Sequence, residues 1–327
     1  MNSPKTEILK VEIKPKGAPL LVDAVRVDSQ TFIIKGKILK TASLKDEWHE
    51  DVDDPQEVIQ ALKDGPVRID FLKFWQRIPE IEPKFPYYKE WPQVAAIPIT
   101  DFKQWWDKQI NCKTRNMVRK SHKLGATIEQ VELNDEFIRG VVAIYNQSPV
   151  RRGKPFRHYG KDFAMTKAEL SVDLGEAMFV AAYYAKELIG FIKFVVTDRY
   201  AMITMILDKT SHRDKAPMNG MVAKVVEICA MRNIPYLTYT TWRRGDHGNF
   251  QKYNGFIKIP VPEYYVPITV RGRLALWLGL HKGIKGAIPE KVKVRLLALR
   301  AKWYNSRVAQ QILSRFRTSK AVTQPAS

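Results

Sequence analysis

The sequence predicts an α/β protein of the α+β kind, with an antiparallel meander at the centre of a mixed sheet. Three runs rich in β-branched and aromatic residues follow one another closely, at 178–184, 188–196 and 200–207. Their connections, 185–187 and 197–199, are so short that the strands must be antiparallel neighbours. A helix opened by Pro217 then leads to a strand at 236–241. This order predicts a crossover between two neighbouring parallel strands.

Further elements on either side of the meander extend this region to about residues 125–270. A strand at 127–131 and a helix from Asn134 or Asp135 to about Tyr145 come first. A polar loop and a second helix follow, at 148–160 and 162–172. After the crossover we expect a short helix at 249–253 and two strands that close the same sheet, at 255–259 and 264–269.

The preceding residues predict a smaller α+β lobe at 21–124, after an extension at 1–20. Its strands are expected at 31–40, 67–75 and 94–99, with a helix that begins at Asp54 and Pro55. Residues 101–123 are predicted to form one long linking helix, and its second half is strongly basic. That charge fits a solvent-exposed bridge between lobes, and phosphate binding is the alternative.

Composition excludes several classes of protein. With 327 residues and 45% hydrophobic content, the chain is long enough for two core-bearing lobes. Two cysteines, Cys112 and Cys229, support neither a disulfide framework nor a zinc finger, so a reducing compartment fits best. Residues 1–16 lack the apolar core of a secretory signal, and no apolar run is long enough to span a bilayer. We expect a cytoplasmic protein.

Charge is concentrated at the C-terminal end. The formal net charge is +20, and residues 271–327 carry thirteen Lys or Arg against one acid, Glu290. Two helices split at 283–289 are expected there, the second with apolar residues on two faces. This basic tail predicts a peripheral contact with an anionic membrane surface, and docking on the protein's own core is the alternative.

The loop that enters the helix at Pro217 is the candidate donor site. Unpaired N–H groups and the positive end of the dipole suit a pyrophosphate there. The predicted donor-binding residues are Arg213, Lys215, Ala216, Met218, Asn219 and Gly220.

Two further groups of side chains are candidates for the acceptor side. The loop between the two helices is rich in guanidinium and aromatic groups, which suits a phosphate, a carboxylate or a stacked sugar. Its residues are Arg151, Arg152, Arg157, His158 and Tyr159. An ordinary basic surface loop is an equal alternative. Asp208 and His212, at the end of the meander and in the next loop, are candidate bases.

The order of elements and the NFQKYNGF segment at 249–256 resemble the GNAT (N-acetyltransferase) superfamily. Phe250 and the Gly255-Phe256 pair match the family's closing motif. The resemblance implies an acyl-CoA donor, acetyl-CoA above all, at the helix start and beside Asn249. Three residues depart from the family pattern: Ala216 and Met218 stand in glycine positions of the phosphate loop, and Gln251 replaces the tyrosine that protonates the leaving thiolate.

Those departures and the extra lobe resemble the FemAB-like branch. This branch pairs two GNAT-like lobes and includes aminoacyl transferases acting on cell-wall precursors. The resemblance implies that the N-terminal lobe is a degenerate copy of the fold. Some relatives carry a catalytic lysine near the closing motif, which makes Lys252 a candidate, and Tyr253 is a candidate acid two positions after Gln251.

The predicted function is transfer of an acyl group from acyl-CoA to an amine or hydroxyl of a small or envelope-related acceptor. The alternatives are an aminoacyl-tRNA-dependent FemAB-like transferase and a non-catalytic nucleic-acid or membrane-surface binding protein on the same fold. No metal is expected, because the acidic residues at 46–54 lack the spaced pattern of a cation site.

Overall fold

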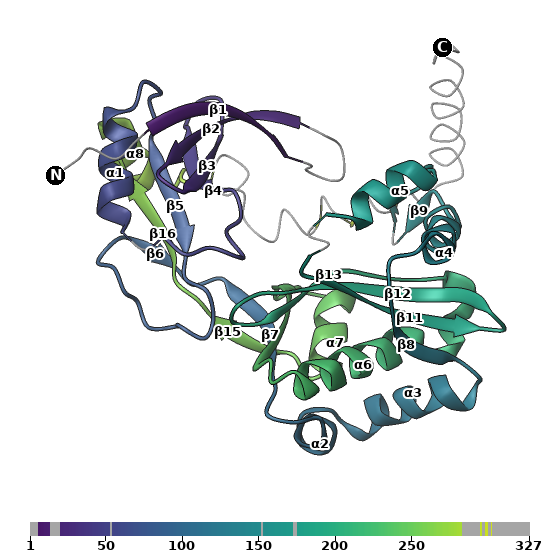
Figure 1. Cartoon of the computed structure of the whole chain (residues 1–327). Coiled ribbons are helices and arrows are strands. Elements are labelled where there is room, and N and C mark those ends of the chain that lie inside the picture. The colour runs from purple at the N-terminus through teal and green to yellow at the C-terminus, as the bar shows by residue number, and fades with distance from the viewer. Residues whose placement is uncertain are drawn as a thin grey trace, which may run out of the picture.

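Two seven-stranded mixed sheets form the protein, joined by short segments that cross between them (Figure 1). The computed structural model describes residues 6–13, 20–52, 54–151, 153–172 and 175–282, together with the single positions 295, 298, 299 and 302. Helices flank both sheets, which confirms the predicted mixed α/β class.

The N-terminal sheet has the strand order β1-β2-β3-β4-β5-β16-β6. The strands are β1 (Thr6–Ile13), β2 (Leu20–Val27), β3 (Gln30–Lys35), β4 (Thr41–Leu44), β5 (Phe71–Trp75), β16 (Glu263–Pro267) and β6 (Lys89–Glu90). Helix α1 (Pro55–Asp64) joins the parallel strands β4 and β5 and buries Val58, Ile59 and Leu62 in the core of this sheet. Asp54 caps its first turn, as the sequence predicted.

The C-terminal sheet has the order β15-β7-β14-β13-β12-β11-β8. Its strands are β7 (Gln93–Pro98), β8 (Thr127–Val131), β11 (Ala177–Tyr184), β12 (Glu187–Val196), β13 (Ala201–Asp208), β14 (Tyr236–Thr241) and β15 (Ile257–Pro260). The predicted meander is confirmed, since β11, β12 and β13 are consecutive antiparallel neighbours. The predicted crossover is confirmed as well, because β13 and β14 are parallel and joined through helix α6 (Pro217–Met231).

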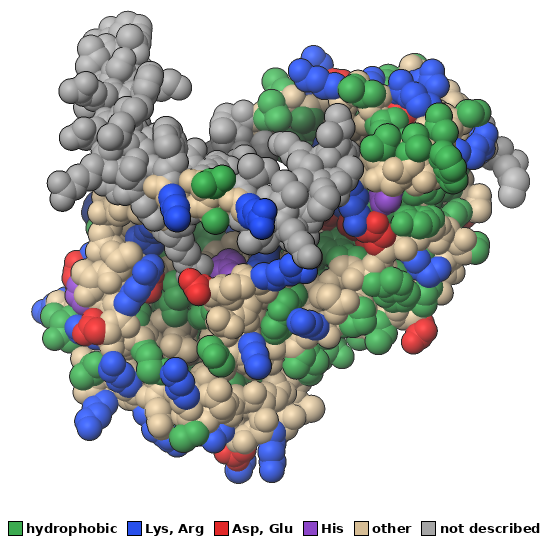
Figure 2. Space-filling model, turned by 180° about the vertical axis from the view of Figure 1, so that it is seen from behind, with side chains coloured by type: hydrophobic (Ala, Val, Ile, Leu, Met, Phe, Trp, Pro, Cys, Tyr) green, Lys and Arg blue, Asp and Glu red, His purple; other side chains and the backbone are tan. Residues whose placement is uncertain are grey.

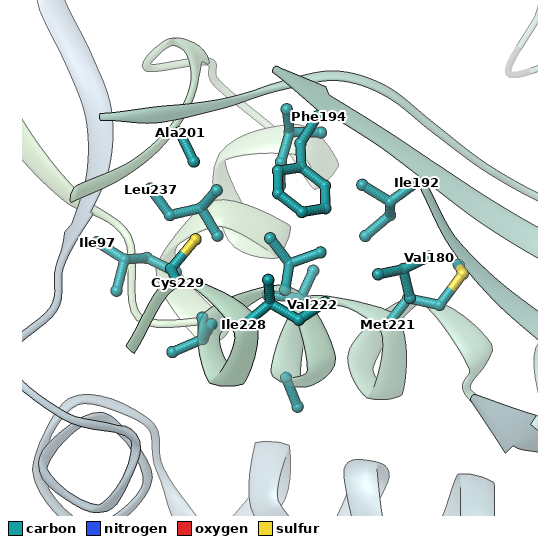
Figure 3. Packing of buried hydrophobic residues seen from close by; sticks show 14 of the residues in the cluster. Ile97, Val180, Ile192, Phe194, Ala201, Met221, Val222, Ile228, Cys229 and Leu237 are labelled. Atoms are coloured by element: carbon teal, nitrogen blue, oxygen red, sulfur yellow. The ribbon is translucent and has the colours of Figure 1, made fainter. Parts of the chain in front are cut away.

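Helices cover both faces of the C-terminal sheet (Figure 1), and alternate side chains of its strands are buried against them. Val180 and Ile192 point to one face and join the core under α6, on which α3 (Cys112–Lys123) packs (Figure 3). Phe179 and Phe191 point to the other face and pack under α4 (Asp135–Tyr145) and α5 (Phe163–Leu170). A central strand apolar on both faces needs helices on both sides.

The two sheets exchange one strand, and here two predictions were wrong. Residues 94–99 were expected in the N-terminal lobe, but β7 lies beside β14 and β15. Residues 264–269 were expected to close the C-terminal sheet, but β16 pairs with β5 and β6. Both segments carry strand-forming side chains, and only long-range packing decides which edge each one joins. The predicted extension at 1–20 also contains a sheet strand, β1, paired with β2.

The predicted single helix at 101–123 was also wrong. A turn, α2 (Phe102–Gln104), continues as a π-helical segment (Trp105–Gln109), and Ile110 is extended before α3 begins. Trp105 and Ile110 are both buried, and a continuous helix does not bring both to the same core. Asn111 then caps α3 by accepting from the N–H of Thr114 at 2.8 Å. Helix α3 is therefore no bridge between the lobes, because it packs on α6 and β8.

Arg77 and Tyr200 hold the two sheets together. Arg77 is buried and forms ion pairs with Asp198 at 2.9 Å and Asp51 at 3.0 Å. The hydroxyl of Tyr200 donates to the carbonyl of Trp48. The acidic segment at 46–54 thus supplies a helix cap and an ion-pair partner.

The tail is described only in part. Helix α8 (Val270–Trp277) is the first helix expected there, and the second lies outside the described residues apart from four single positions. Of the described helices, none has the length and apolar character needed to cross a membrane.

Candidate active site

The parallel strands β13 and β14 diverge and open a cavity between them. Their register holds only at Ala201 with Leu237 and at Met202 with Thr238. A register irregularity between β12 and β13 leaves Thr204 without an opposite residue on β12. Thr204 lies at the wall of a cavity of about 470 Å³. This volume is in the range of small-molecule sites.

Six elements contribute to the cavity wall. Strand β13 supplies residues 204–208, and the others come from the loop before α5, the 3₁₀ turn (Thr210–Lys215), the start of α6, strand β14 and helix α7 (Asp246–Tyr253). The lining residues from these other elements are Arg151, Lys154, Pro155, Phe156, Arg157, His158, Arg213, Met218, Tyr239, His247 and Phe250. The floor is apolar and the rim is mainly basic.

Helix α6 begins at the cavity without a side-chain cap. Ala216 precedes it in the left-handed region, with φ of +52°, and Pro217 is the first helical residue. Met218 lines the cavity and Asn219 donates to the amide oxygen of Asn254 at 3.0 Å. Pro217 has no N–H and the N–H of Asn219 donates to the carbonyl of Ala216 at 3.2 Å, so the N–H of Met218 is the first-turn donor that suits an anion.

Gly220 faces the opposite side of α6. A Cβ there would come within 2.1 Å of Cδ1 of Ile128 and 2.7 Å of Oγ of Ser121. Close packing of α6 on α3 and β8 therefore explains this glycine, whereas the sequence analysis grouped it with the donor site.

Asp208 and Arg213 pair with each other at the cavity wall. The Asp208 side chain is buried and accepts from Nε of Arg213 at 3.2 Å, and its carbonyl accepts from Nη1 of Arg151 at 3.0 Å. A carboxylate held this way is a structural anchor for the turn rather than a free base.

The loop before α5 forms the basic wall of the cavity. A hairpin of β9 (Val150–Arg151) and β10 (Lys154–Pro155) shapes it, and the guanidinium of Arg151 lies 4.4 Å from the ring centroid of Phe156. Arg157 and His158 follow and also line the cavity. The predicted residue Arg152 lies outside the described residues.

Behind this wall, Glu169 organises a buried polar network. Its carboxylate accepts from the Tyr145 hydroxyl at 3.0 Å and from Nζ of Lys161 at 2.8 Å, and it lies 3.1 Å from Nδ1 of His158. Burial raises the pKa of Glu169, but the hydrogen bonds from His158 and Lys161 outweigh it and hold the pKa at about 2. Burial lowers the pKa of His158, so its ring is neutral at pH 7.

Tyr239 and His247 are titratable groups on the opposite wall, and neither was predicted from the sequence. The Tyr239 hydroxyl lies 3.4 Å from Nε2 of His247, which α7 supplies. Gln251, in place of the family tyrosine, is fully buried and donates to the carbonyl of Tyr239 at 3.0 Å while its oxygen accepts from the N–H of Arg243 at 3.0 Å. Gln251 therefore fixes the end of β14 and the start of α7.

Several predicted residues lie away from the cavity lining. His212 contacts Oγ of Ser211 at 2.9 Å and lies over the ring of Tyr184, and Nζ of Lys215 lies 4.4 Å from the centroid of the same ring. The remaining ones are half-buried Tyr159 and the exposed residues Asn249, Lys252 and Tyr253. Lys252 and Tyr253, like His212, are absent from the residues lining the described cavity.

The arrangement suits transfer of a group between two ligands that meet at one strand edge. The register of β13 with β14 ends at Met202, and backbone N–H groups at such a strand edge suit polarisation of a carbonyl. The Tyr239–His247 pair holds a transferable proton. Among the described residues, no cluster of three or more His, Cys, Asp or Glu side chains is placed to hold a metal ion.

Comparison with known proteins identifies the fold. No protein-family model matches the sequence, and no curated protein matches it either. Among solved structures, the C-terminal DUF2156 domain of an assigned lysylphosphatidylglycerol synthetase from Agrobacterium fabrum aligns at 13% identity and a TM-score of 0.53, covering 85% of this chain and 91% of that one. FemX aligns at 10% identity and a TM-score of 0.52, with coverages of 80% and 88%.

L-PGS from Bacillus licheniformis aligns at 11% identity with a TM-score of 0.50, covering 77% of this chain and 85% of that one. At such identities the likeness shows the fold alone. The chain has the GNAT and FemAB-like fold, which confirms the resemblance predicted from the sequence.

Proposed function

We propose that the protein is a transferase that moves an acyl or aminoacyl group to an amine or hydroxyl acceptor in the cavity between β13 and β14. The divergence of these two strands supports the proposal most directly, since β13 continues to Asp208 while its register with β14 ends at Met202. An extended donor arm with amide groups fits along such an open strand edge.

The chemistry follows from this position of the donor. The acceptor nitrogen or oxygen attacks the donor carbonyl from the side of Arg151 and Arg157, a new C–N or C–O bond forms, and the bond to the donor's leaving atom breaks. Edge N–H groups of β13 stabilise the oxyanion. Tyr239 gives its proton to the leaving atom, and His247 or solvent restores it. The proton lost by the acceptor passes to solvent.

For the donor we favour acyl-CoA, acetyl-CoA above all. The start of α6 offers the N–H of Met218 and the positive end of the helix dipole to a pyrophosphate, and the side chains of Met218 and Phe250 line the adjoining apolar floor. Arg213 lies at the same wall, where its guanidinium is paired with the carboxylate of Asp208.

An aminoacyl-tRNA donor is the second candidate, and helix α3 favours it. Helix α3 does not bridge the two lobes. It exposes four basic side chains to solvent, Lys113, Arg119, Lys120 and Lys123. Lys and Arg also predominate over Asp and Glu on the face shown in Figure 2. A polyanion the size of tRNA binds such a surface through its phosphates. FemX and L-PGS share the fold, which is compatible with this donor.

We further propose an envelope-related acceptor and action at the membrane surface. Two of the similar structures bear the name of lysylphosphatidylglycerol synthesis. Helix α8 exposes Val270, Leu274 and Trp277 on one side, with Trp277 81% exposed. Together with exposed Arg273 these side chains suit an anionic bilayer surface, whereas Arg271 is paired with buried Asp70. Both cysteines are free thiols, which is compatible with the cytoplasm.

Thermal unfolding with candidate donors tests the proposal. Acetyl-CoA, longer acyl-CoAs and charged tRNA are each added to the full-length protein, and the shift in Tm is measured. We expect one donor class to raise Tm and Met218→Glu to abolish the rise. A carboxylate in the first turn interacts favourably with the helix dipole, so loss of the Tm shift does not reflect a weaker helix.

Met165→Glu, on the exposed side of α5, is the matched control and should keep the full shift. If neither CoA derivatives nor charged tRNA alter Tm, or if Met218→Glu keeps the shift, the donor site is disproved. Steeply salt-dependent binding of uncharged RNA alone points to the non-catalytic alternative.

A further inference from the structure

The basic side chains at the cavity wall differ in whether other groups of the protein already bind them. Arg151 donates to the carbonyls of Asp208 and Ile144, and Arg213 pairs with the carboxylate of Asp208. Lys154 and Arg157 are exposed. Within the described part of the chain, neither Nζ of Lys154 nor the Nη groups of Arg157 make a hydrogen bond. These two residues therefore hold positive charge that is available to a ligand.

Arg157 is nevertheless held in place through its inner nitrogen. Nε of Arg157 donates to Nε2 of His158 at 2.8 Å. This bond requires a lone pair on Nε2, so the proton of the neutral ring must be on Nδ1. The guanidinium is then fixed at one edge while its two terminal amino groups stay free at the cavity wall.

Glu169 selects this tautomer of His158. Its carboxylate, 3.1 Å from Nδ1, accepts the Nδ1 proton and cannot donate one. Lys161 and the Tyr145 hydroxyl fix the same carboxylate, and the rings of Tyr145 and His158 lie 4.4 Å apart. Tyr145, Lys161 and His158 are buried and Glu169 is partly buried, whereas Arg157 reaches solvent.

We propose that Glu169 and His158 are positioning residues that aim the guanidinium of Arg157 into the cavity, where Arg157 and Lys154 bind a phosphate group of the acceptor. Placing a phosphate on the acceptor rests on the proposed transferase function, but the anion site itself does not. A guanidinium held by Nε presents its two Nη groups side by side, which matches two phosphate oxygens.

The neighbouring surface indicates what else the ligand carries. Phe156, Met205 and Leu207 line the cavity beside the basic rim. A phosphate attached to an apolar group satisfies both surfaces, either as a lipid headgroup or as a soluble phosphate ester.

Calorimetric titration of the full-length protein with inorganic phosphate, at constant ionic strength, tests the site. We expect Arg157→Ala to weaken phosphate binding roughly tenfold or more, and Arg232→Ala, an exposed arginine at the other end of α6, to leave it unchanged. No phosphate binding by the wild type, or equal binding by Arg157→Ala and the control, overturns the proposal.

Paired variants of His158 separate positioning from simple packing. His158→Gln keeps an acceptor for Arg157 and a donor to Glu169, so phosphate affinity should be largely retained. His158→Phe keeps the ring against Tyr145 but has no acceptor, and we expect severalfold weaker binding. Glu169→Gln can donate to Nδ1 and move the ring proton to Nε2, which also releases Arg157. Equal phosphate affinity in His158→Gln and His158→Phe contradicts the relay even if Glu169→Gln does not fold.

Vesicles distinguish the two sources of phosphate. Arg157-dependent binding to phosphatidylglycerol vesicles, but not to phosphatidylcholine vesicles, identifies a lipid headgroup, whereas phosphate binding without vesicle binding identifies a soluble ester. Either result supports the site. A Tm shift with the donor that persists in Arg157→Ala shows that donor binding is intact, so the two proposals fail separately.

Discussion

Each sheet contains one parallel pair of strands, and the two pairs end differently. In the N-terminal sheet β4 pairs with β5 from Thr41 to Ser43 and ends at Leu44. In the C-terminal sheet β13 continues from its last pair with β14, at Met202, to Asp208. Between β13 and β14 lies a cavity of about 470 Å³, while the pocket at the end of β5, which residues of both sheets line, measures about 10 Å³.

The filled pocket has a clear cause. Trp48, from the loop after β4, packs edge-on against Trp75 with ring centroids 4.2 Å apart, and Nε1 of Trp75 donates to the carbonyl of Glu47 at 3.2 Å. The helix starts differ in the same sense. The Asp54 carboxylate accepts from the first-turn N–H groups of α1, whereas the first-turn N–H groups of α6 receive no side-chain cap.

This difference is informative because the two sheets otherwise have the same plan. Counted from β1 in the N-terminal sheet and from β8 in the C-terminal sheet, neighbouring strands form three antiparallel pairs, then one parallel pair, then two antiparallel pairs. We propose that the N-terminal lobe is a degenerate copy of the fold, and the shared order of pairings supports this proposal. One parallel pair stabilises the protein and the other is open for a ligand.

The largest expected effect is on stability, and it comes from removing the Trp75 side chain at the end of the N-terminal parallel pair. Trp75→Ala should lower the free energy of unfolding by about 3–5 kcal/mol, because it removes a buried indole and leaves a cavity. Denaturant unfolding measures the change. Trp91→Ala, at an indole 44% exposed, is the control and should cost far less. A loss below about 1 kcal/mol in Trp75→Ala shows that the N-terminal pair is not closed by packing.

An intermediate effect is expected in the open pair. Tyr239→Phe removes the hydroxyl at the cavity wall and should lower the transfer rate about a hundredfold with little change in Tm, because the ring still packs. The rate is measured with the donor class that raises Tm. Tyr236→Phe, on the same strand but outside the cavity lining, should retain the wild-type rate. Equal rates in the two variants remove Tyr239 as the proton donor.

The smallest effect concerns the helix cap. Asp54→Ala should lower the free energy of unfolding by about 1 kcal/mol, because the N–H groups of Gln56 and Glu57 lose their acceptor. Asp64→Ala, at the negative end of the same helix, is the matched control and should be neutral or slightly stabilising. If both variants have the same stability, the Asp54 cap does not distinguish α1 from α6.

The sequence by itself determined the elements that depend on nearby residues. The meander follows from two short connections between β-rich runs, and α6 begins at Pro217 because proline fits the first helical position. The order of these elements was enough to predict the fold, and the donor loop placed from it stays a prediction. In each case the deciding interactions lie within a few residues of one another.

Only the tertiary structure decided the features that depend on distant partners. β7 and β16 have similar strand-forming sequences, and the free edges of β14 and β5 select where each one pairs. Arg157 and His158 were candidates from the sequence, but Glu169 was not, because only the packing of α5 places its carboxylate behind the loop. Tyr239 lines the cavity because β13 and β14 diverge, whereas the sequence indicated only a strand residue. Burial and long-range pairing, which local patterns do not encode, created these sites.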